Sequence, residues 1–240
     1  MFIPFGFMSS PPAAPSGGWV TSGLVLNLMI YDASSYPGSG TAITDLSGNS
    51  LNGTINGTVS YNAPGYIDFN GTSNYVSVAD NSLIDLSTAY TFDTLVFADD
   101  FLDRFRLIDK YSFSGGGTGY TWATQQANSG KLFSYVDSTL AGNALSPTAV
   151  STGQYLNLTL TRDGNSTIMY LNGASFWNTT TGTTSAPTTN TDDLAFGRGL
   201  DGGGGFDFGK GRWAHGRIYD RALTPAEVLQ NYNAIPAALQ

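Results

Sequence analysis

The chain has 240 residues, of which 41% are hydrophobic and 13% aromatic, enough for one large β domain or two small ones. Only 12% of the residues are charged and the formal net charge is −8, a field that repels a phosphate backbone and excludes nucleic-acid binding as a main activity. The absence of cysteine excludes disulfides, thiolate metal sites and thiol nucleophiles, and fits folding in a reducing cytoplasm.

The chain begins with an apolar segment that differs from everything after it. An aromatic stretch is followed by a Pro/Ser/Ala/Gly-rich stretch, and we interpret residues 1–22 as an extended anchoring arm and linker. The arm either folds onto its own domain or docks on another subunit, and contiguous apolar surface favours docking. The expected docking residues are Phe2, Ile3, Phe5, Phe7 and Met8. No apolar run is long enough to cross a bilayer, so no membrane partner is expected.

Residues 24–222 consist of short strand signals separated by turn signals, with no helix between them. We expect strands at residues 24–30, 90–97 and 104–111, among others. Three hairpins are expected, which join residues 66–69 to 75–78, 120–125 to 131–136, and 155–160 to 167–171. The pattern predicts an all-β fold: an antiparallel β-sandwich (jelly roll) with sheets packed face to face.

The chain ends in a strand, a turn and one short helix. Thr224 can cap the helix, Pro225 suits its first position, and Glu227 can reach back to the N–H of the cap residue. An apolar stripe along this helix predicts that it docks on the sandwich.

An ordered set of motifs carries a family resemblance. The motifs are Ser35-Tyr36-Pro37-Gly38-Ser39-Gly40, Asp45-Leu46-Ser47-Gly48-Asn49, Gly53-Thr54, Phe69-Asn70-Gly71 with Tyr75-Val76, and Arg217–Thr224. The set resembles the concanavalin A-like lectin/glucanase superfamily, in its laminin-G-like and pentraxin-like branch. The resemblance implies one sandwich domain over residues 23–240. The Ser-Tyr-Pro-Gly-Ser-Gly variant is similar to domains of structural proteins in tailed-bacteriophage virions.

Hydrolases of this superfamily use paired carboxylates that face one cleft, a chemistry that the sequence does not provide along a strand. The single glutamate, Glu227, belongs to the helix cap. Neighbouring aspartates such as Asp192 and Asp193 would point to opposite faces of a strand. His215 is the only histidine, no Gly-x-Ser-x-Gly elbow accompanies it, and we expect it in a core or interface. We therefore predict that the protein is not an enzyme, unless distant aspartates converge.

The resemblance also implies a structural calcium ion. Asp45, Asn49 and Asn52 lie in one tight loop, and Asp220 follows the final strand, which in this family runs near the amino-terminal segment. Calcium needs several oxygen ligands, which these side chains could supply. The alternative is that Asp45 and Asn49 fix turns through side-chain-to-backbone hydrogen bonds.

Sugar binding requires aromatic platforms on an exposed face. The candidates are Tyr120 and Trp122 on one strand, Tyr135 on its partner and Trp177 near a loop. Residues two apart on a strand share a face, so Tyr120 and Trp122 should project together. The alternative is that these aromatic side chains fill the core or an interface.

Together these features favour a non-enzymatic surface protein of a tailed-phage virion, made in the host cytoplasm. It would be a capsid decoration, head appendage or tail component, with the arm anchored on other virion proteins or on a second copy. The outward-facing sandwich would touch cell-surface glycans. The alternative is a free carbohydrate-binding lectin module.

Overall fold

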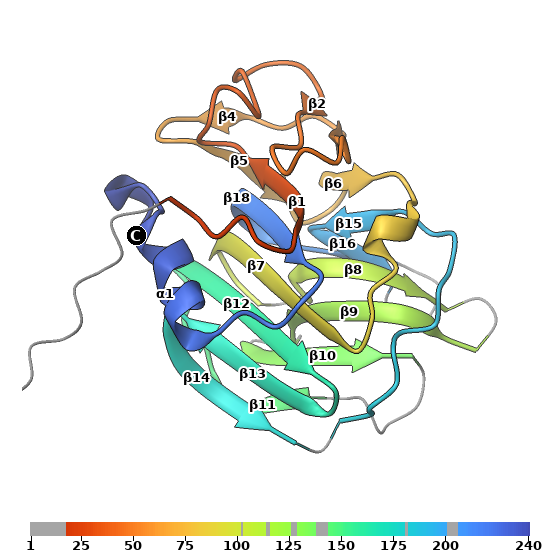
Figure 1. Cartoon of the computed structure of the whole chain (residues 1–240). Coiled ribbons are helices and arrows are strands. Elements are labelled where there is room, and N and C mark those ends of the chain that lie inside the picture. The colour runs from red at the N-terminus through yellow and green to blue at the C-terminus, as the bar shows by residue number, and fades with distance from the viewer. Residues whose placement is uncertain are drawn as a thin grey trace, which may run out of the picture.

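The strands of the described residues pair into two antiparallel eight-stranded sheets and one short ribbon (Figure 1). The computed structural model describes residues 18–101, 103–113, 116–125, 129–137, 144–180, 182–200 and 206–240. The two sheets pack face to face around one large cluster of buried apolar side chains. The predicted fold class, an antiparallel β-sandwich with one short helix near the carboxyl end, is confirmed within this part of the chain.

The first sheet, here called sheet A, is built around strands β7 and β18. Its strands are β1 (Leu24–Met29), β4 (Tyr61–Asn62), β5 (Tyr66–Asn70), β7 (Ala89–Ala98), β12 (Tyr155–Asp163), β13 (Ser166–Leu171), β14 (Ala174–Thr179) and β18 (Lys210–Tyr219). Their order is β14-β13-β12-β7-β18-β5-β4, and β1 also pairs with β18. Because β5 takes the first half of the free edge of β18, β1 pairs only with its second half.

The second sheet, sheet B, has the order β11-β10-β9-β8-β15-β6-β3-β2. Its strands are β2 (Ala42–Ile43), β3 (Gly53–Asn56), β6 (Tyr75–Val78), β8 (Arg106–Ser112), β9 (Thr118–Thr124), β10 (Lys131–Val136), β11 (Ala144–Ala149) and β15 (Leu194–Phe196). A separate ribbon of β16 (Arg198–Leu200) and β17 (Phe206–Phe208) follows β15, and β16 lies against β8.

Aromatic residues from both sheets fill the space between them. Phe92 of sheet A stacks against Trp122 of sheet B, with ring centres 6.4 Å apart. Trp213 of β18 likewise packs against Phe196 of β15. Each of these side chains is fully buried, and such rings contribute large apolar areas to a core.

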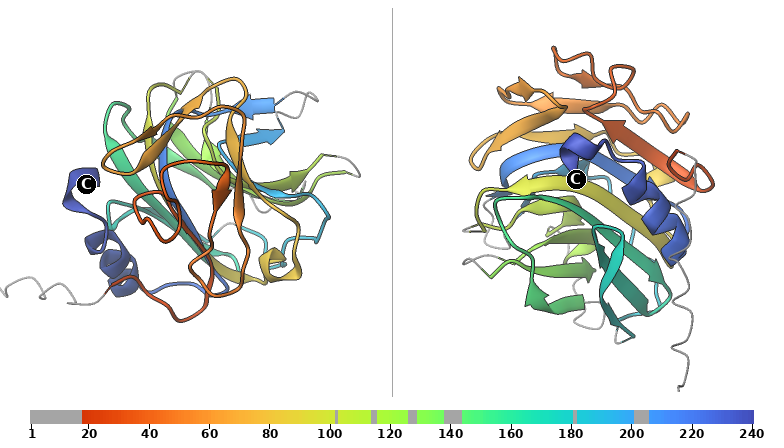
Figure 2. Two further views of the ribbon diagram at one scale, coloured as in Figure 1. Left: turned by 90° about the horizontal axis from the view of Figure 1, so that it is seen from above. Right: turned by 90° about the vertical axis from the view of Figure 1, so that its left-hand side faces the viewer.

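Helix α1 (Pro225–Asn233) begins as the sequence predicts. Thr224 accepts a hydrogen bond from the Glu227 N–H at 3.3 Å, and the Glu227 carboxylate accepts one from the Thr224 N–H at 2.8 Å. Figure 2 shows the helix lying against the strands of sheet A, where Val228 is buried beside Tyr219. The described residues also form two short 3-10 helices, Ser82–Ile84 and Ala237–Leu239. Within the described residues, no helix is sufficiently long and apolar to span a membrane.

Two of the three expected hairpins are confirmed, since β9 pairs with β10 and β12 with β13. The hairpin expected from residues 66–69 and 75–78 is wrong, because β5 belongs to sheet A and β6 to sheet B. Asn70 explains the difference: its side-chain oxygen accepts hydrogen bonds from the N–H groups of Thr72 and Ser73. This longer turn carries the chain from one sheet to the other instead of folding it back.

Residues just before β1 are tied to the end of the chain. The Val20 N–H donates to the Asn231 side chain at 2.8 Å, and the Val20 carbonyl accepts from the Tyr219 hydroxyl at 3.1 Å. Gln230 donates to the Gly18 carbonyl at 2.7 Å. The domain boundary expected at residue 23 therefore falls inside a segment that already contacts the sandwich.

Candidate functional site

The outer face of sheet B carries two adjacent pockets that share Tyr111 as a wall. The larger, here called the polar pocket, has a volume of about 390 Å³ and is lined by Tyr75, Ser77, Asp109, Tyr111, Thr191, Asp192, Asp193, Ala195, Arg198, Gly199 and Phe206. The smaller, the aromatic pocket, has a volume of about 250 Å³ and is lined by Arg104, Arg106, Tyr111, Phe113, Thr121, Phe133 and Tyr135. Together they form one candidate binding groove.

Strand geometry explains why these side chains face outward. On β10, Leu132 is buried in the core whereas Phe133 and Tyr135 line the groove. On β9, Trp122 is in the core whereas its neighbour Thr121 lines the groove. Successive side chains of a strand alternate between faces, so the bulky core residues place the groove residues on the outside.

The aromatic pocket presents two exposed rings. Phe113 is 43% exposed and Tyr135 is 38% exposed. Each ring packs edge-on against a more buried partner: Phe113 against Tyr111 with ring centres 4.9 Å apart, and Tyr135 against Phe133 at 5.1 Å. The edge-on contacts hold the rings in place, so the groove offers a fixed apolar surface.

A network of charges joins the two pockets. Arg106 lies between two carboxylates, donating to Asp207 at 2.6 Å and to Asp109 at 3.1 Å. Arg104 also donates to Asp207, at 3.1 Å. Thr121 donates its hydroxyl to Asp109 at 2.6 Å. Because Arg106, Asp109 and Asp207 are nearly buried and every charge of the network is paired, the network fixes the groove floor instead of leaving free charges there.

Asp109 has the most altered acidity in the groove. Burial raises its pKa to about 6, against the opposing effects of the Arg106 guanidinium and the Thr121 hydroxyl. A carboxyl group with a raised pKa in a pocket is a feature of functional sites. One of its oxygens, Oδ2, already accepts hydrogen bonds from Arg106 and Thr121.

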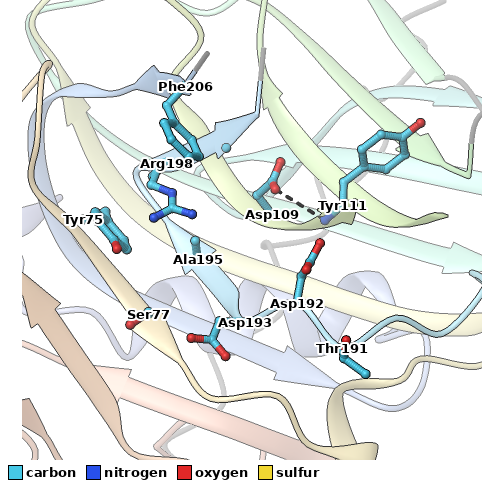
Figure 3. Close-up of a pocket in the computed structure, with 11 residues that line it drawn as sticks. Tyr75, Ser77, Asp109, Tyr111, Thr191, Asp192, Asp193, Ala195, Arg198 and Phe206 are labelled. Atoms are coloured by element: carbon cyan, nitrogen blue, oxygen red, sulfur yellow. Dashed lines mark hydrogen bonds between the residues drawn. The ribbon is translucent and has the colours of Figure 1, made fainter. Parts of the chain in front are cut away.

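The polar pocket has a cationic end and an acidic end (Figure 3). Arg198 lies beside Tyr75 and Phe206, whereas Asp192 and Asp193 lie across the pocket from it. The small side chain of Ala195 occupies the floor between the two ends. Asp109 of β8 lines the same pocket as Asp192 and Asp193, so aspartates that are distant in the sequence do share one pocket.

Two of the four predicted sugar-binding residues lie in the core. Trp122 is fully buried and Tyr120 is 2% exposed, with the Tyr120 hydroxyl donating to the Ile84 carbonyl at 2.9 Å. Neither ring is available as a platform, so these two expectations are wrong. The prediction that Tyr120 and Trp122 share one face of their strand is confirmed, but that face points into the core. Tyr135 does line the groove, whereas Trp177 lies on β14 of the other sheet and packs against the core.

Sequence reasoning missed most of the groove. Tyr111 and Phe113, like Phe133 and Tyr135, are aromatic pairs two residues apart, which is a sign of a shared strand face. Once Trp122 is known to lie in the core, the alternation along the strands identifies these aromatic pairs as outward-facing. Arg198 and Phe206 carried no such sign, because only the β16–β17 ribbon brings them together.

The residues predicted to bind calcium gather around the start of β1, where they make hydrogen bonds to the protein itself. The Asp45 carboxylate accepts four hydrogen bonds, from the backbone N–H groups of Asn27, Ser47 and Leu51 and from the Ser47 hydroxyl. The Asn52 side-chain oxygen accepts one from the Asp45 N–H at 3.0 Å.

The other two predicted ligands complete this picture. Asn49 donates its amide to the Val25 carbonyl at 2.8 Å, and the exposed Asp220 lies close to Gly23. No described cluster of three or more His, Cys, Asp or Glu side chains could hold a metal ion. Because donors already occupy the Asp45 and Asn52 oxygens, these contacts match the alternative in which the loop residues fix turns. Calcium binding stays a prediction, which thermal melts with calcium and with chelator would test.

His215 lies in a buried polar cluster of sheet A, away from the groove. The Arg217 guanidinium donates to Asp93 at 3.0 Å and to the Tyr31 hydroxyl at 2.8 Å. The Tyr31 hydroxyl, which accepts from Arg217, then donates to His215 Nδ1 at 3.0 Å. This tautomer directs the Nε2–H of His215 toward Asp93, 3.6 Å away. Asp93, His215 and Arg217 are fully buried, as expected for a core histidine.

The proposed docking residues Phe2, Ile3, Phe5, Phe7 and Met8 lie outside the described residues.

Sequence comparison identifies the family. The laminin G family model for the concanavalin A-like lectin/glucanases superfamily matches residues 70–229, more than half of the chain. The protein belongs to this superfamily. A search of curated protein sequences found no significant match.

Solved structures share the fold at low sequence identity. The binding domain of botulinum neurotoxin DC, in complex with rat synaptotagmin II, matches with a TM-score of 0.67 and 12% identity over 91% of this chain and 52% of that chain. Trypanosoma rangeli sialidase in complex with sialic acid matches with a TM-score of 0.62 and 13% identity, over 88% of this chain and 32% of that chain.

A third structure is matched over nearly its whole length. Domain 4 of AbnA, an extracellular arabinanase of Geobacillus stearothermophilus solved with arabinotriose, has a TM-score of 0.61 and 20% identity, covering 87% of this chain and 98% of that chain. By contrast, the chain spans about half of the toxin chain and a third of the sialidase chain. These similarities define a lectin-like fold.

Proposed function

We propose that the protein binds carbohydrate in the groove on the outer face of sheet B. The observation that carries this proposal is the aromatic pocket, where the exposed rings of Phe113 and Tyr135 stand beside Arg104. The apolar faces of sugar rings pack on aromatic side chains, and sugar hydroxyls need nearby donors and acceptors. The adjoining polar pocket supplies both, since it combines Arg198 with Ser77 and Asp193.

The size of the groove supports an oligosaccharide as ligand. The two pockets, of about 390 and 250 Å³, are joined at Tyr111 and differ in lining. Volumes of this order are typical of small-molecule sites. A ligand of several sugar units can place one ring on the aromatic side and another on the polar side.

Substitution of Tyr135 by Ala tests the proposal. We expect the variant to lose at least about tenfold in affinity for the oligosaccharides that the intact protein binds on a glycan array, because it removes an exposed stacking surface. Tyr61→Ala is the matched control, since Tyr61 is an equally exposed tyrosine (41%) outside the groove. Loss of binding in both variants, or in neither, would contradict the assignment of the groove.

The proposal includes binding without hydrolysis. Its support is that Asp109 is held by Arg106 and Thr121, while Glu227 serves the helix cap. Prolonged incubation with each oligosaccharide bound on the array should release no shorter product by mass spectrometry. Cleavage that Asp109→Asn abolishes would make the protein a hydrolase.

We further propose that the protein works on the surface of a tailed-phage virion, held there by residues 1–17 while the groove faces cell-surface glycans. Its support is the sequence: the apolar arm and the Ser35–Gly40 motif. Virions assembled with a chain lacking residues 1–17 should lack the protein, as measured by mass spectrometry of purified particles. Normal incorporation would contradict the role of the arm.

A further inference from the structure

The Arg198 guanidinium contacts two aromatic rings. Its guanidinium carbon lies 4.5 Å from the centre of the Tyr75 ring and 4.3 Å from the centre of the Phe206 ring. Among the described residues, it makes no hydrogen bond or ion pair. Because contacts with rings leave the guanidinium hydrogen-bond donors unpaired, its N–H groups remain to meet a ligand in the polar pocket.

The other arginines of the groove are already neutralised. Arg104 and Arg106 both pair with Asp207, and Arg106 also pairs with Asp109. Two cations thus face two anions in the network. Arg198 is therefore the one described groove cation that has no carboxylate partner among the described residues.

The backbone of the β16–β17 ribbon packs closely against the charge network of Arg106 and Asp109. A side chain at Gly199 would come within 2.6 Å of the Asp109 carboxylate and 2.8 Å of the Arg106 Nε. Glycine at this position lets β16 lie directly on β8, and Arg198, the residue before it, lines the polar pocket.

The acidic end of the pocket is separate from Arg198. Asp192 and Asp193 lie on the side of Ser77 and Thr191 (Figure 3). One oxygen of Asp193 accepts the Asp80 N–H at 3.1 Å. Carboxylates accept hydrogen bonds from hydroxyl groups but repel anions, so the two ends of the pocket favour different parts of a ligand.

We propose that the polar pocket takes an acidic sugar, with its carboxylate bound to Arg198 and its hydroxyls donating to the carboxylates of Asp192 and Asp193. A guanidinium edge presents two parallel N–H donors that match the two oxygens of a carboxylate. This inference rests on the proposed carbohydrate-binding function and adds the class of sugar to it.

Matched pairs of saccharides test the inference by isothermal titration. The pairs are sialyllactose against lactose and tri-galacturonic acid against its methyl ester, so each pair differs in the free carboxylate. We expect at least one acidic member to bind at least about tenfold more tightly than its neutral partner, the effect of one charge-assisted bidentate pair. The preference should weaken as salt is raised.

Variants of Arg198 assign that preference to its side chain. Arg198→Gln should bind the acidic and neutral members equally, and Arg198→Lys should keep only part of the preference because it loses the planar fork. Arg212→Gln is the matched control: Arg212 also lies between two rings, 4.8 Å from Tyr66 and 4.3 Å from Phe97, but outside the groove. Equal melting temperatures would show that the variants fold.

The outcomes separate the two proposals. Equal binding of acidic and neutral members, or a preference that survives in Arg198→Gln, overturns the acidic-sugar inference and leaves carbohydrate binding in place. Tighter binding of sulfated lactose than of either carboxylate probe would also overturn it, because the anion would then be a sulfate ester. If no saccharide binds at all, the proposed function fails and the inference fails with it.

Discussion

His215 shows how burial sets the protonation of a single side chain. Burial and the neighbouring Arg217 guanidinium lower its pKa from 6.5 to about 4, although Asp93 opposes this. The same contacts with His215 and Arg217 hold the pKa of Asp93 below its usual range despite burial. At neutral pH the cluster therefore consists of a neutral imidazole and one buried ion pair.

The lowered pKa makes stability depend on pH in a defined direction. The folded protein keeps His215 neutral down to pH about 4, whereas the unfolded chain takes up a proton below its ordinary pKa of 6.5. The contribution of His215 to the free energy of unfolding is therefore complete above pH 6.5 and is lost as the pH falls toward 4. Protonation of Asp93 lowers the free energy of unfolding further, but only below the ordinary pKa of 3.8.

We expect His215→Asn to remove this dependence. Relative to the variant, the wild-type protein should lose about 3 kcal/mol in free energy of unfolding between pH 6.5 and 4, measured by urea denaturation at each pH. Asp109, whose raised pKa of about 6 acts in the opposite direction, is present in both proteins and cancels in the comparison. A difference that stays constant with pH would contradict the neutral buried histidine.

Single residues were the hardest features to predict from the sequence. The sequence predicts a core or interface position for His215, and its neighbours confirm the core. Tyr135 was assigned correctly to an outer face, but Trp122 was not, because alternation tells which residues share a face and not which face is inside. Arg198 could not be foreseen, since the rings that hold it come from distant parts of the chain.

At the scale of elements, the short helix α1 is specified by local chemistry. Thr224, Pro225 and Glu227 form the predicted start, and Arg221 adds an ion pair to Glu227 at 2.6 Å. Hydrogen bonds from Arg221 lower the pKa of Glu227 to about 2, so its carboxylate stays ionised across the ordinary pH range.

Thr224→Ala should lower the free energy of unfolding by about 1 kcal/mol, because the N–H of Glu227 loses its cap. Urea denaturation at neutral pH measures this change. Thr224→Ser keeps the hydroxyl and should stay within about 0.5 kcal/mol of the wild-type value. Equal losses in both variants would show that the methyl group of Thr224, and not its hydroxyl, carries the effect.

Hairpins were predictable where the turn is short and local. The β9–β10 and β12–β13 pairs follow directly from alternation around a turn. The connection from β5 to β6 also carries a turn signal, Asn70-Gly71, yet it crosses between sheets. Besides the longer turn at Asn70, tertiary pairing separates the two strands: β18 and β4 occupy the edges of β5, and β3 and β15 occupy those of β6.

At the scale of the whole molecule, the sandwich includes residues that the sequence assigned to the linker. Trp19 lies over the Arg217 guanidinium at 5.4 Å, and Val20 is 7% exposed. Arg221 also donates to the Ser22 carbonyl at 3.1 Å. Because Gly, Pro and Ser dominate residues 9–18, composition alone could not mark where packing begins.

Two truncations test where the sandwich begins. A chain that starts at residue 18 should unfold with the free energy of the full chain, since every contact described here is kept. A chain that starts at residue 23 should lose about 2–4 kcal/mol, because it leaves the buried Asn231 side chain without its partner at Val20. Equal stability of the two truncated chains in urea denaturation would contradict this boundary.

The overall class of fold was readable because strand and turn signals run through the whole chain, and the packing of two apolar faces leaves few other arrangements. The groove could not be predicted from the sequence, because it depends on which face of each strand points outward and on the packing of the β16–β17 ribbon against β8.

The most direct test of the central claim is a crystal structure of the protein with an oligosaccharide that it binds on the array. We predict that a sugar ring packs on Tyr135 and that the ligand extends past Tyr111 toward Arg198. A ligand bound instead at the loop of Asp45 and Asn49, or on the outer side of sheet A, would contradict it.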